Sequence, residues 1–153
     1  MCIRDRSRKS PKIAALFRAL PPSCRNPRYA VFFECFNRGF YFEAHEILEE
    51  LWLTTKGDPA GFYKGLIQLA GAFVHLSKSR AGPSLRLLRL AEANLAPHAP
   101  EHEGLDVAFL LDRVNGWVRR LEQGDPASDL CAPPAAPRID LGFQPVAKRP
   151  GML

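Results

Sequence analysis

The chain has 153 residues, of which 46% are hydrophobic and 24% are charged, and its formal net charge is +5. These values indicate a soluble globular protein of one domain, long enough to bury a real core. They exclude a membrane-spanning helix, because no stretch approaches the roughly 20 apolar residues that such a helix needs. We also expect no secretory signal, because no charged segment followed by an apolar one opens the chain.

The positive charge lies at the two ends of the chain. Residues 1–28 contain eight basic residues and one acidic residue, whereas residues 29–141 contain eleven basic and fifteen acidic residues. A mildly acidic body binds phosphates poorly, so we expect nucleic acid not to bind through it. Salt-sensitive binding of nucleic acid through the basic tail stays open as the third-ranked function.

The four cysteines, Cys2, Cys24, Cys35 and Cys131, are far apart and form no C-x-x-C pair. This spacing is not that of a zinc ribbon or a redox motif, and it indicates free thiols in a reducing compartment. We therefore expect a cytoplasmic protein.

The chain divides into a body and two tails. Residues 1–28 are basic and interrupted by prolines, and we predict that they form a flexible segment. Within it, residues 12–20 have the apolar spacing of two helical turns, which either dock on the body or stay mobile. Residues 1–6 can be back-translated to a transposon-end sequencing adapter, so we interpret them as an artefact. Residues 29–141 are the predicted helical domain and residues 142–153 a loose C-terminal tail.

The body is predicted to be all-α, a single compact bundle of about five helices. Apolar residues recur with helical spacing, and prolines and glycines mark the helix ends. The second and third helices are expected to pack together at the centre, because the third is apolar nearly all round. The expected helices cover residues 27–37, 40–53, 59–77, 83–95 and 105–123.

The segment between the last two helices, residues 96–104, is expected to be a loop, because its two prolines forbid a regular helix. The polar residues of this loop do not share a helix face, and we interpret them as a polar surface loop. They are His98, Glu101 and His102.

The helix over residues 40–53 has chemically active side chains at the edge of its buried face, and we expect a functional site there. His45 and Glu49, four residues apart, project from one side at the edge of the buried face, near Trp52. The glutamates on the face expected in water are Glu43, Glu46 and Glu50. One helix thus combines a core stripe, an acidic stripe and a line of chemically active side chains.

An imidazole and a carboxylate at this spacing can share a divalent ion such as zinc, iron or manganese. Residues 45–49 have the form H-E-x-x-E, which resembles the zinc-protease pattern with its second histidine replaced by Glu49. In that pattern Glu46 is the general base. The following helix carries one polar line, formed by Lys64, Gln68, Gly71, His75 and Lys78. The predicted third ligand is His75 on this line, where Gln68 is placed to orient a water or a ligand.

Plainer interpretations of the same residues stay open. His45, Glu49 and Gln68 alternatively satisfy one another as a buried hydrogen-bond network in a non-catalytic scaffold or homo-oligomer. His75 taken alone is more often a satisfied core histidine than a ligand.

Several blocks of the sequence resemble the hallmark of domain-of-unknown-function family number 309. They are residues 36–52 (FNRGFYFEAHEILEELW), 64–70 (KGLIQLA), 75–76 and 104–106, within a span of about residues 29–141. The family's H-x-x-x-E-x-x-W/Y motif is met by His45, Glu49 and Trp52. The resemblance implies a small all-α fold in bacteria, archaea and plastid-bearing lineages, with a suspected metal-binding role for that motif. It implies no known reaction.

We therefore predict a helical protein that binds a divalent metal or a small ligand through His45 and Glu49, with His75 as a further metal ligand. If the protein is an enzyme, metal-dependent hydrolysis is the leading class and Glu46 the candidate catalytic residue. The residues predicted to bind a ligand or to support the site are Tyr41, Trp52 and Gln68. The expected partner is a small molecule or a second copy of the chain, and not a membrane.

Overall fold

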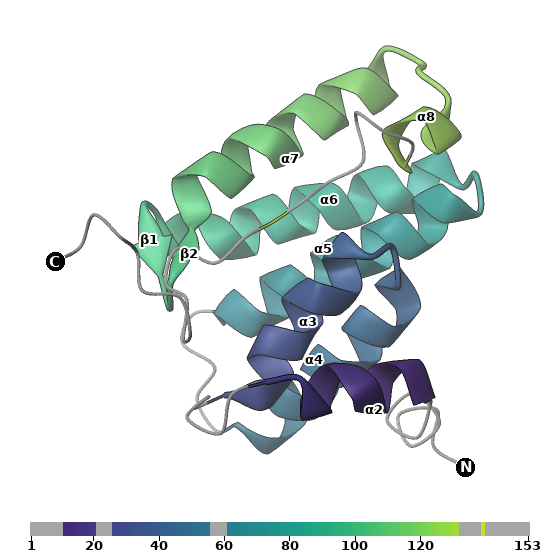
Figure 1. Ribbon diagram of the computed structural model, residues 1–153. Coiled ribbons are helices and arrows are strands. Elements are labelled where there is room, and N and C mark those ends of the chain that lie inside the picture. Colours follow the sequence, from purple (N-terminus) through teal and green to yellow (C-terminus); the bar gives the residue numbers. More distant parts are fainter. Residues whose placement is uncertain (1–10, 21–25, 56–60, 132–138, 140–153) are drawn as a thin grey trace, which may run out of the picture.

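The computed structural model describes residues 11–20, 26–55, 61–131 and 139. These residues form seven α-helices, one short 3-10 turn and a two-stranded hairpin (Figure 1), which confirms the predicted all-α class and compact bundle. The elements are α2 (Pro11–Arg18), α3 (Pro27–Asn37), α4 (Tyr41–Thr54), α5 (Phe62–Ser77), α6 (Ala81–Leu95), η2 (Ala96–His98), β1 (Glu101–His102), β2 (Leu105–Asp106), α7 (Val107–Glu122) and α8 (Ala127–Cys131).

The five expected helices correspond to α3 to α7. Their ends agree with the expected ends to within about two residues, except that the start expected at residue 59 lies outside the described residues. The two additional helices, α2 and α8, are the shortest. Helix boundaries follow from prolines, glycines and capping residues. At the start of α3, for example, Asn26 lies just before Pro27, and its side chain accepts a hydrogen bond from the Tyr29 amide.

Helix α5 is the central helix of the bundle. Ten of its sixteen residues are buried, and it packs along α4 on one side and α6 on the other (Figure 1). Apolar residues at almost every position leave it only a narrow polar line, so burial between two helices is its stable arrangement. The expected central packing of the second and third predicted helices, α4 and α5, is confirmed.

Phe73 of α5 lies fully buried where four helices meet. Its ring centroid is 5.5 Å from that of Phe36 on α3, 5.2 Å from that of Tyr41 on α4, and 4.9 Å from that of Trp117 on α7. Burial, with a smaller effect from Cys131, raises the pKa of the Tyr41 hydroxyl to about 12. Tyr41, predicted to bind a ligand or to support the site, is therefore a protonated member of the core.

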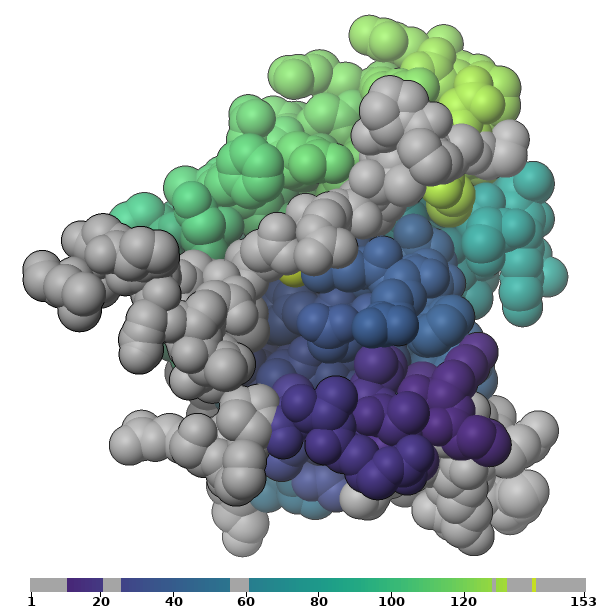
Figure 2. Space-filling view, in the orientation of Figure 1, coloured from purple at the N-terminus to yellow at the C-terminus, as the bar shows by residue number. Residues whose placement is uncertain are grey.

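Helix α2 docks on the body. Ile13 and Leu16 are buried, and Lys12 Nζ lies 3.2 Å from Glu43 Oε2 of α4. Figure 2 shows α2, in purple, lying against the blue surface of the helices that follow it. Of the two arrangements left open for the helical turns of the N-terminal segment, α2 adopts the docked one, because its apolar side finds an apolar surface to cover.

Other predictions about the tails fall outside the described residues. They are the adapter artefact at residues 1–6, the flexibility of residues 1–10 and 21–25, and the loose tail at residues 142–153. Beyond α8 the one described residue is Ile139, which is buried and exchanges hydrogen bonds of 2.7 and 2.8 Å with the Asn37 side chain. In the part of the chain that the structure describes, no helix has the length and apolarity to cross a membrane.

The loop expected at residues 96–104 is less exposed than predicted. Only 9% of the surface of His98 is exposed, and its ring centroid lies 5.1 Å from that of Phe62. The His102 ring packs on the same phenylalanine at 4.4 Å, whereas Glu101 is exposed as expected. The surface interpretation is wrong for His98, because an aromatic ring from α5, more than thirty residues away, covers it.

Glu103 joins the β1–β2 hairpin to α3 and α5 by hydrogen bonds. The Tyr29 hydroxyl of α3 donates to the Glu103 carbonyl at 3.0 Å, and the Tyr63 hydroxyl of α5 donates to its carboxylate at 2.9 Å. Burial, with a smaller effect from Glu103, raises the pKa of Tyr29 far above its usual range. Both tyrosines act as structural donors in this contact.

Gly65 of α5 lies so close to α6 that no side chain fits. A Cβ atom there would be 2.9 Å from Leu95 Cγ and 3.2 Å from Asn94 Cβ. We expect Gly65→Ala to lower the free energy of unfolding by about 1–2 kcal/mol, because overpacking outweighs the helix preference of alanine. Denaturant titration measures this, with Gly116→Ala of α7 as control, where an added Cβ has no neighbour within 4 Å among the described residues. Equal stability of the two variants would contradict the close packing of α5 on α6.

Cys35 is predicted to be chemically protected. Its side chain is fully buried, and burial, with a smaller effect from Glu43, raises the pKa of the thiol to about 12. Because the thiolate is the nucleophile, iodoacetamide at pH 8 should leave Cys35 unmodified in the folded protein. Burial also raises the pKa of Cys131, but its thiol is partly exposed and should react faster than that of Cys35. Peptide mass spectrometry with and without denaturant checks this. Alkylation of both at one rate in the folded protein would be inconsistent with the packing of α3.

Candidate metal site

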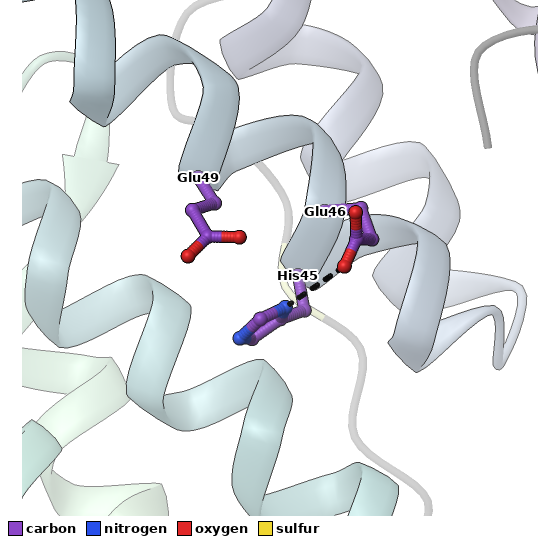
Figure 3. Close-up of side chains that lie close together, drawn as sticks. All are labelled: His45, Glu46 and Glu49. Carbon is purple, nitrogen blue, oxygen red and sulfur yellow. Dashed lines mark ion pairs between the residues drawn. The ribbon is translucent and has the colours of Figure 1, made fainter. Parts of the chain in front are cut away.

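Helix α4 carries the candidate site. His45, Glu46 and Glu49 each offer one ligand atom, and these atoms lie within 4.8 Å of one another. Among the described residues they are the one group of three or more histidine, cysteine or acidic side chains close enough to hold a metal ion. Figure 3 shows the His45 ring and the Glu49 carboxylate on one side of α4, as expected for residues four apart, with Glu46 on the adjacent side.

His45 occupies a half-buried position against α5. Its Cδ2 atom lies 3.8 Å from the position that a Cβ of Gly71 would take. Its Nδ1 atom has no hydrogen-bond partner within the described residues and lies 4.0 Å from Glu46 Oε2. Burial lowers the pKa of His45, and the nearby Glu49 offsets this only in part. The imidazole is therefore neutral at pH 7, which is the form that binds metal ions.

The lowered pKa of His45 predicts how stability depends on pH without metal. The unfolded chain, with a histidine pKa of about 6.5, takes up this proton before the folded chain does, so stability is lost as the pH falls below that value. In EDTA, the melting temperature of the wild type should fall relative to that of His45→Gln between pH 7 and pH 5. Above pH 7 the two should run parallel. Parallel curves over the whole range would mean that the pKa of His45 is not lowered.

The acidic stripe of α4 faces other helices rather than water, which corrects the expectation from its periodicity. Glu46 exposes only 6% of its surface. Glu43 pairs with Lys12 of α2 at 3.2 Å, and Glu50 pairs with Arg28 of α3 at 3.3 Å. The periodicity of α4 alone could not indicate this, because the covering helices and their positive charges come from other segments. Their docking encloses the Glu46 carboxylate beside the imidazole.

His75, the predicted third ligand, is not a member of this group. It lies on the expected polar line of α5, partly exposed, and its Nδ1 atom has no hydrogen-bond partner within the described residues. The position of contact along the helix explains the difference. α4 meets the polar line at Gly71, where the His45 ring lies, one turn before His75. Helical periodicity gives the face of a contact but not its level along the axis.

The other predicted supporting residues, Gln68 and Trp52, make contacts outside the His45–Glu46–Glu49 group. The Gln68 side-chain carbonyl accepts a hydrogen bond of 2.7 Å from Asn94 of α6. Trp52 is partly buried and packs against the edge of the core. Within the described residues, the Gln68 carbonyl is bonded to α6 and His45 Nδ1 has no hydrogen-bond partner, so this geometry does not favour a closed network of His45, Glu49 and Gln68.

An open cavity elsewhere on the molecule does not contain the site. Its volume is about 450 Å³, and it is lined by residues of α7 and of the turn that follows. The lining residues are Asp112, Arg113, Gly116, Trp117, Arg119, Arg120 and Gln123. No sequence motif pointed to this surface, and Trp117 within it is a core residue packed on Phe73. The cavity is therefore separate from the His45–Glu46–Glu49 group of α4.

The chain has a recognisable relative. An uncharacterized protein of Bacillus subtilis (strain 168), YpuF, is 36% identical over 90 residues, which cover 54% of this chain and 49% of that protein. The chain thus spans about half the length of the curated relative that it matches. No solved structure matches the chain significantly. Residues 29–87, which include most of α3, all of α4 and α5 and the His45–Glu46–Glu49 group, match the model of a domain of unknown function (DUF309), which confirms the resemblance to that family found in the sequence.

Proposed function

We propose that this chain binds a divalent transition-metal ion through His45, Glu46 and Glu49. The observation that supports this most directly is the convergence of the three ligand atoms within 4.8 Å of one another. Imidazole nitrogens and carboxylate oxygens lie about 2.0–2.2 Å from a bound zinc ion. Ligand atoms at this separation need only small side-chain rotations to reach one ion.

The donor set suits a metal ion. A neutral imidazole with two carboxylates is a nitrogen and oxygen set of the kind that zinc, iron and manganese accept. The lowered pKa of His45 leaves its lone pair available at neutral pH.

Three protein ligands leave a coordination position open for water, as in catalytic zinc sites. Metal-assisted hydrolysis therefore stays our predicted reaction class if the protein is an enzyme. Glu46 has two possible roles that exclude one another. It is a metal ligand, with the bound water as base, or it is the general base, with His45 and Glu49 holding the ion.

Elemental analysis of the purified protein, after incubation with zinc and gel filtration, tests the proposal. We expect close to one zinc per wild-type chain and little in His45→Gln, because the variant lacks the imidazole donor. His102→Gln is the matched control, since His102 belongs to the hairpin and not to the group on α4. Zinc-free wild-type protein, or full zinc content in His45→Gln, would overturn the proposal.

The variants Glu46→Gln and Glu49→Gln distinguish the two roles proposed for Glu46, metal ligand and general base. If both glutamates are ligands, each variant should weaken zinc binding, measured by competition with a chromophoric chelator. If Glu46 is instead a base, its variant should keep the wild-type affinity while Glu49→Gln does not. Retention of wild-type affinity by Glu49→Gln would contradict both assignments.

A further inference from the structure

Gly71 of α5 is a glycine that the fold does not require. A Cβ atom there would lie 3.4 Å from Leu87 Cδ1 of α6 and 3.8 Å from His45 Cδ2 of α4, which are ordinary van der Waals distances. Its backbone is ordinary helix, without a positive φ. Alanine would therefore fit, and it would favour the helix over glycine. Gly65, two turns earlier, has no such room.

The surroundings of Gly71 are those of the candidate site. The position is partly exposed, with the His45 ring on the α4 side and the Leu87 side chain on the α6 side. One turn further along α5, the Nδ1 atom of His75 has no hydrogen-bond partner within the described residues. The missing side chain leaves room for about one methyl group between the His45 ring and the Leu87 side chain.

We propose that Gly71 is the floor on which a second molecule lies while it coordinates the metal ion. This inference rests on the proposed metal site. The open coordination position next to His45 takes a donor atom of the molecule, and a short apolar group extends across Gly71 to Leu87. Gly71 is then a specificity-determining residue, and its absent side chain sets the size of the group that fits.

The charge of the site selects the class of ligand. Two carboxylates, Glu46 and Glu49, already balance the charge of a divalent ion, so an anionic ligand would bring uncompensated negative charge into a half-buried position. A neutral oxygen or nitrogen donor, such as an amide carbonyl, an alcohol or an azole, adds no charge. The expected ligand is therefore a small neutral molecule with a short apolar chain, rather than a carboxylate or a phosphate.

Cobalt-loaded protein provides the test, because the visible spectrum of the ion responds to a new ligand. Imidazole and 1-butylimidazole are titrated into the wild type, with butyrate as the anionic probe. We expect 1-butylimidazole to bind about tenfold more tightly than imidazole, from burial of about two methylene groups, and butyrate to bind more weakly than either. In Gly71→Ala this preference should fall to about twofold or less, with cobalt content unchanged.

Gly116→Ala, a helical glycine of α7 with open space around it, is the matched control and should keep the tenfold preference. Leu87→Ala removes the side chain that the apolar group is proposed to contact, and it should also lose the tenfold preference for 1-butylimidazole. This second variant keeps the test valid if Gly71→Ala does not fold. Cobalt binding with an undiminished preference in these two variants would overturn the inference and leave the metal site standing. Tighter binding of butyrate would overturn the assigned ligand class, and failure to bind cobalt through His45 would overturn both proposals.

Discussion

Phe73→Ala is expected to lower the free energy of unfolding by about 3–5 kcal/mol, the usual cost of truncating a fully buried phenylalanine. The ring is 0% exposed and makes contacts of about 5 Å between centroids with Phe36, Tyr41 and Trp117. Its removal leaves a cavity at the junction of α3, α4, α5 and α7, where no single helix can move to fill it. Denaturant unfolding followed by circular dichroism measures the loss.

Phe109→Ala is the matched control on α7. This phenylalanine is 55% exposed, so the same truncation removes little buried area and should change stability by less than about 0.5 kcal/mol. Both variants truncate phenylalanine to alanine, so the difference between their losses of unfolding free energy reports the effect of burial. Similar losses in both would mean that Phe73 is not the packing centre of the bundle.

Much of this fold follows from local signals in the sequence. Proline at a helix start, glycine after a helix end and apolar spacing of three to four residues located α3 to α7 to within about two residues, apart from the start of α5, which was expected outside the described residues. The even apolar character of α5 predicted its central position, since only a helix surrounded by others can bury every face. These signals are contained within single helices and need no knowledge of distant contacts.

The errors concern contacts between segments far apart in the chain. The periodicity of its own helix places Glu46 on a polar face and predicts that it lies in water, but α2 and α3 cover that face. His98 was placed on the surface because its neighbours in the loop are polar, but the Phe62 ring covers it. In each case a residue from another element decides the burial, and helical periodicity carries no information about it.

The candidate site was predictable in part for the same reason. His45 and Glu49 lie on one helix, so their spacing alone brings them together. A third ligand from another helix depends on how two helices are offset along their axes. This offset brings Gly71, rather than His75, to His45. The structure instead adds Glu46 to the group.

Zinc at about a thousand times its dissociation constant is expected to raise the free energy of unfolding of the wild type by about 4 kcal/mol. An ion that binds only the folded chain stabilises it by mass action, whatever the packing around the site. If His45→Gln weakens zinc binding about a hundredfold, the gain at the same zinc concentration falls to about 1.4 kcal/mol. Thermal unfolding with stepwise additions of zinc measures both gains.

The same melts in EDTA separate a metal site from a structural hydrogen-bond network. In a network, His45→Gln would destabilise the protein without metal, because it would leave buried partners unsatisfied, and zinc would not stabilise the wild type. The structure favours the opposite result. His45 Nδ1 has no hydrogen-bond partner within the described residues, and the Gln68 carbonyl is occupied by Asn94. We therefore expect the two apoproteins to be of similar stability at pH 7 and zinc to separate them. A difference present in EDTA and unchanged by zinc would assign the His45 group to structure.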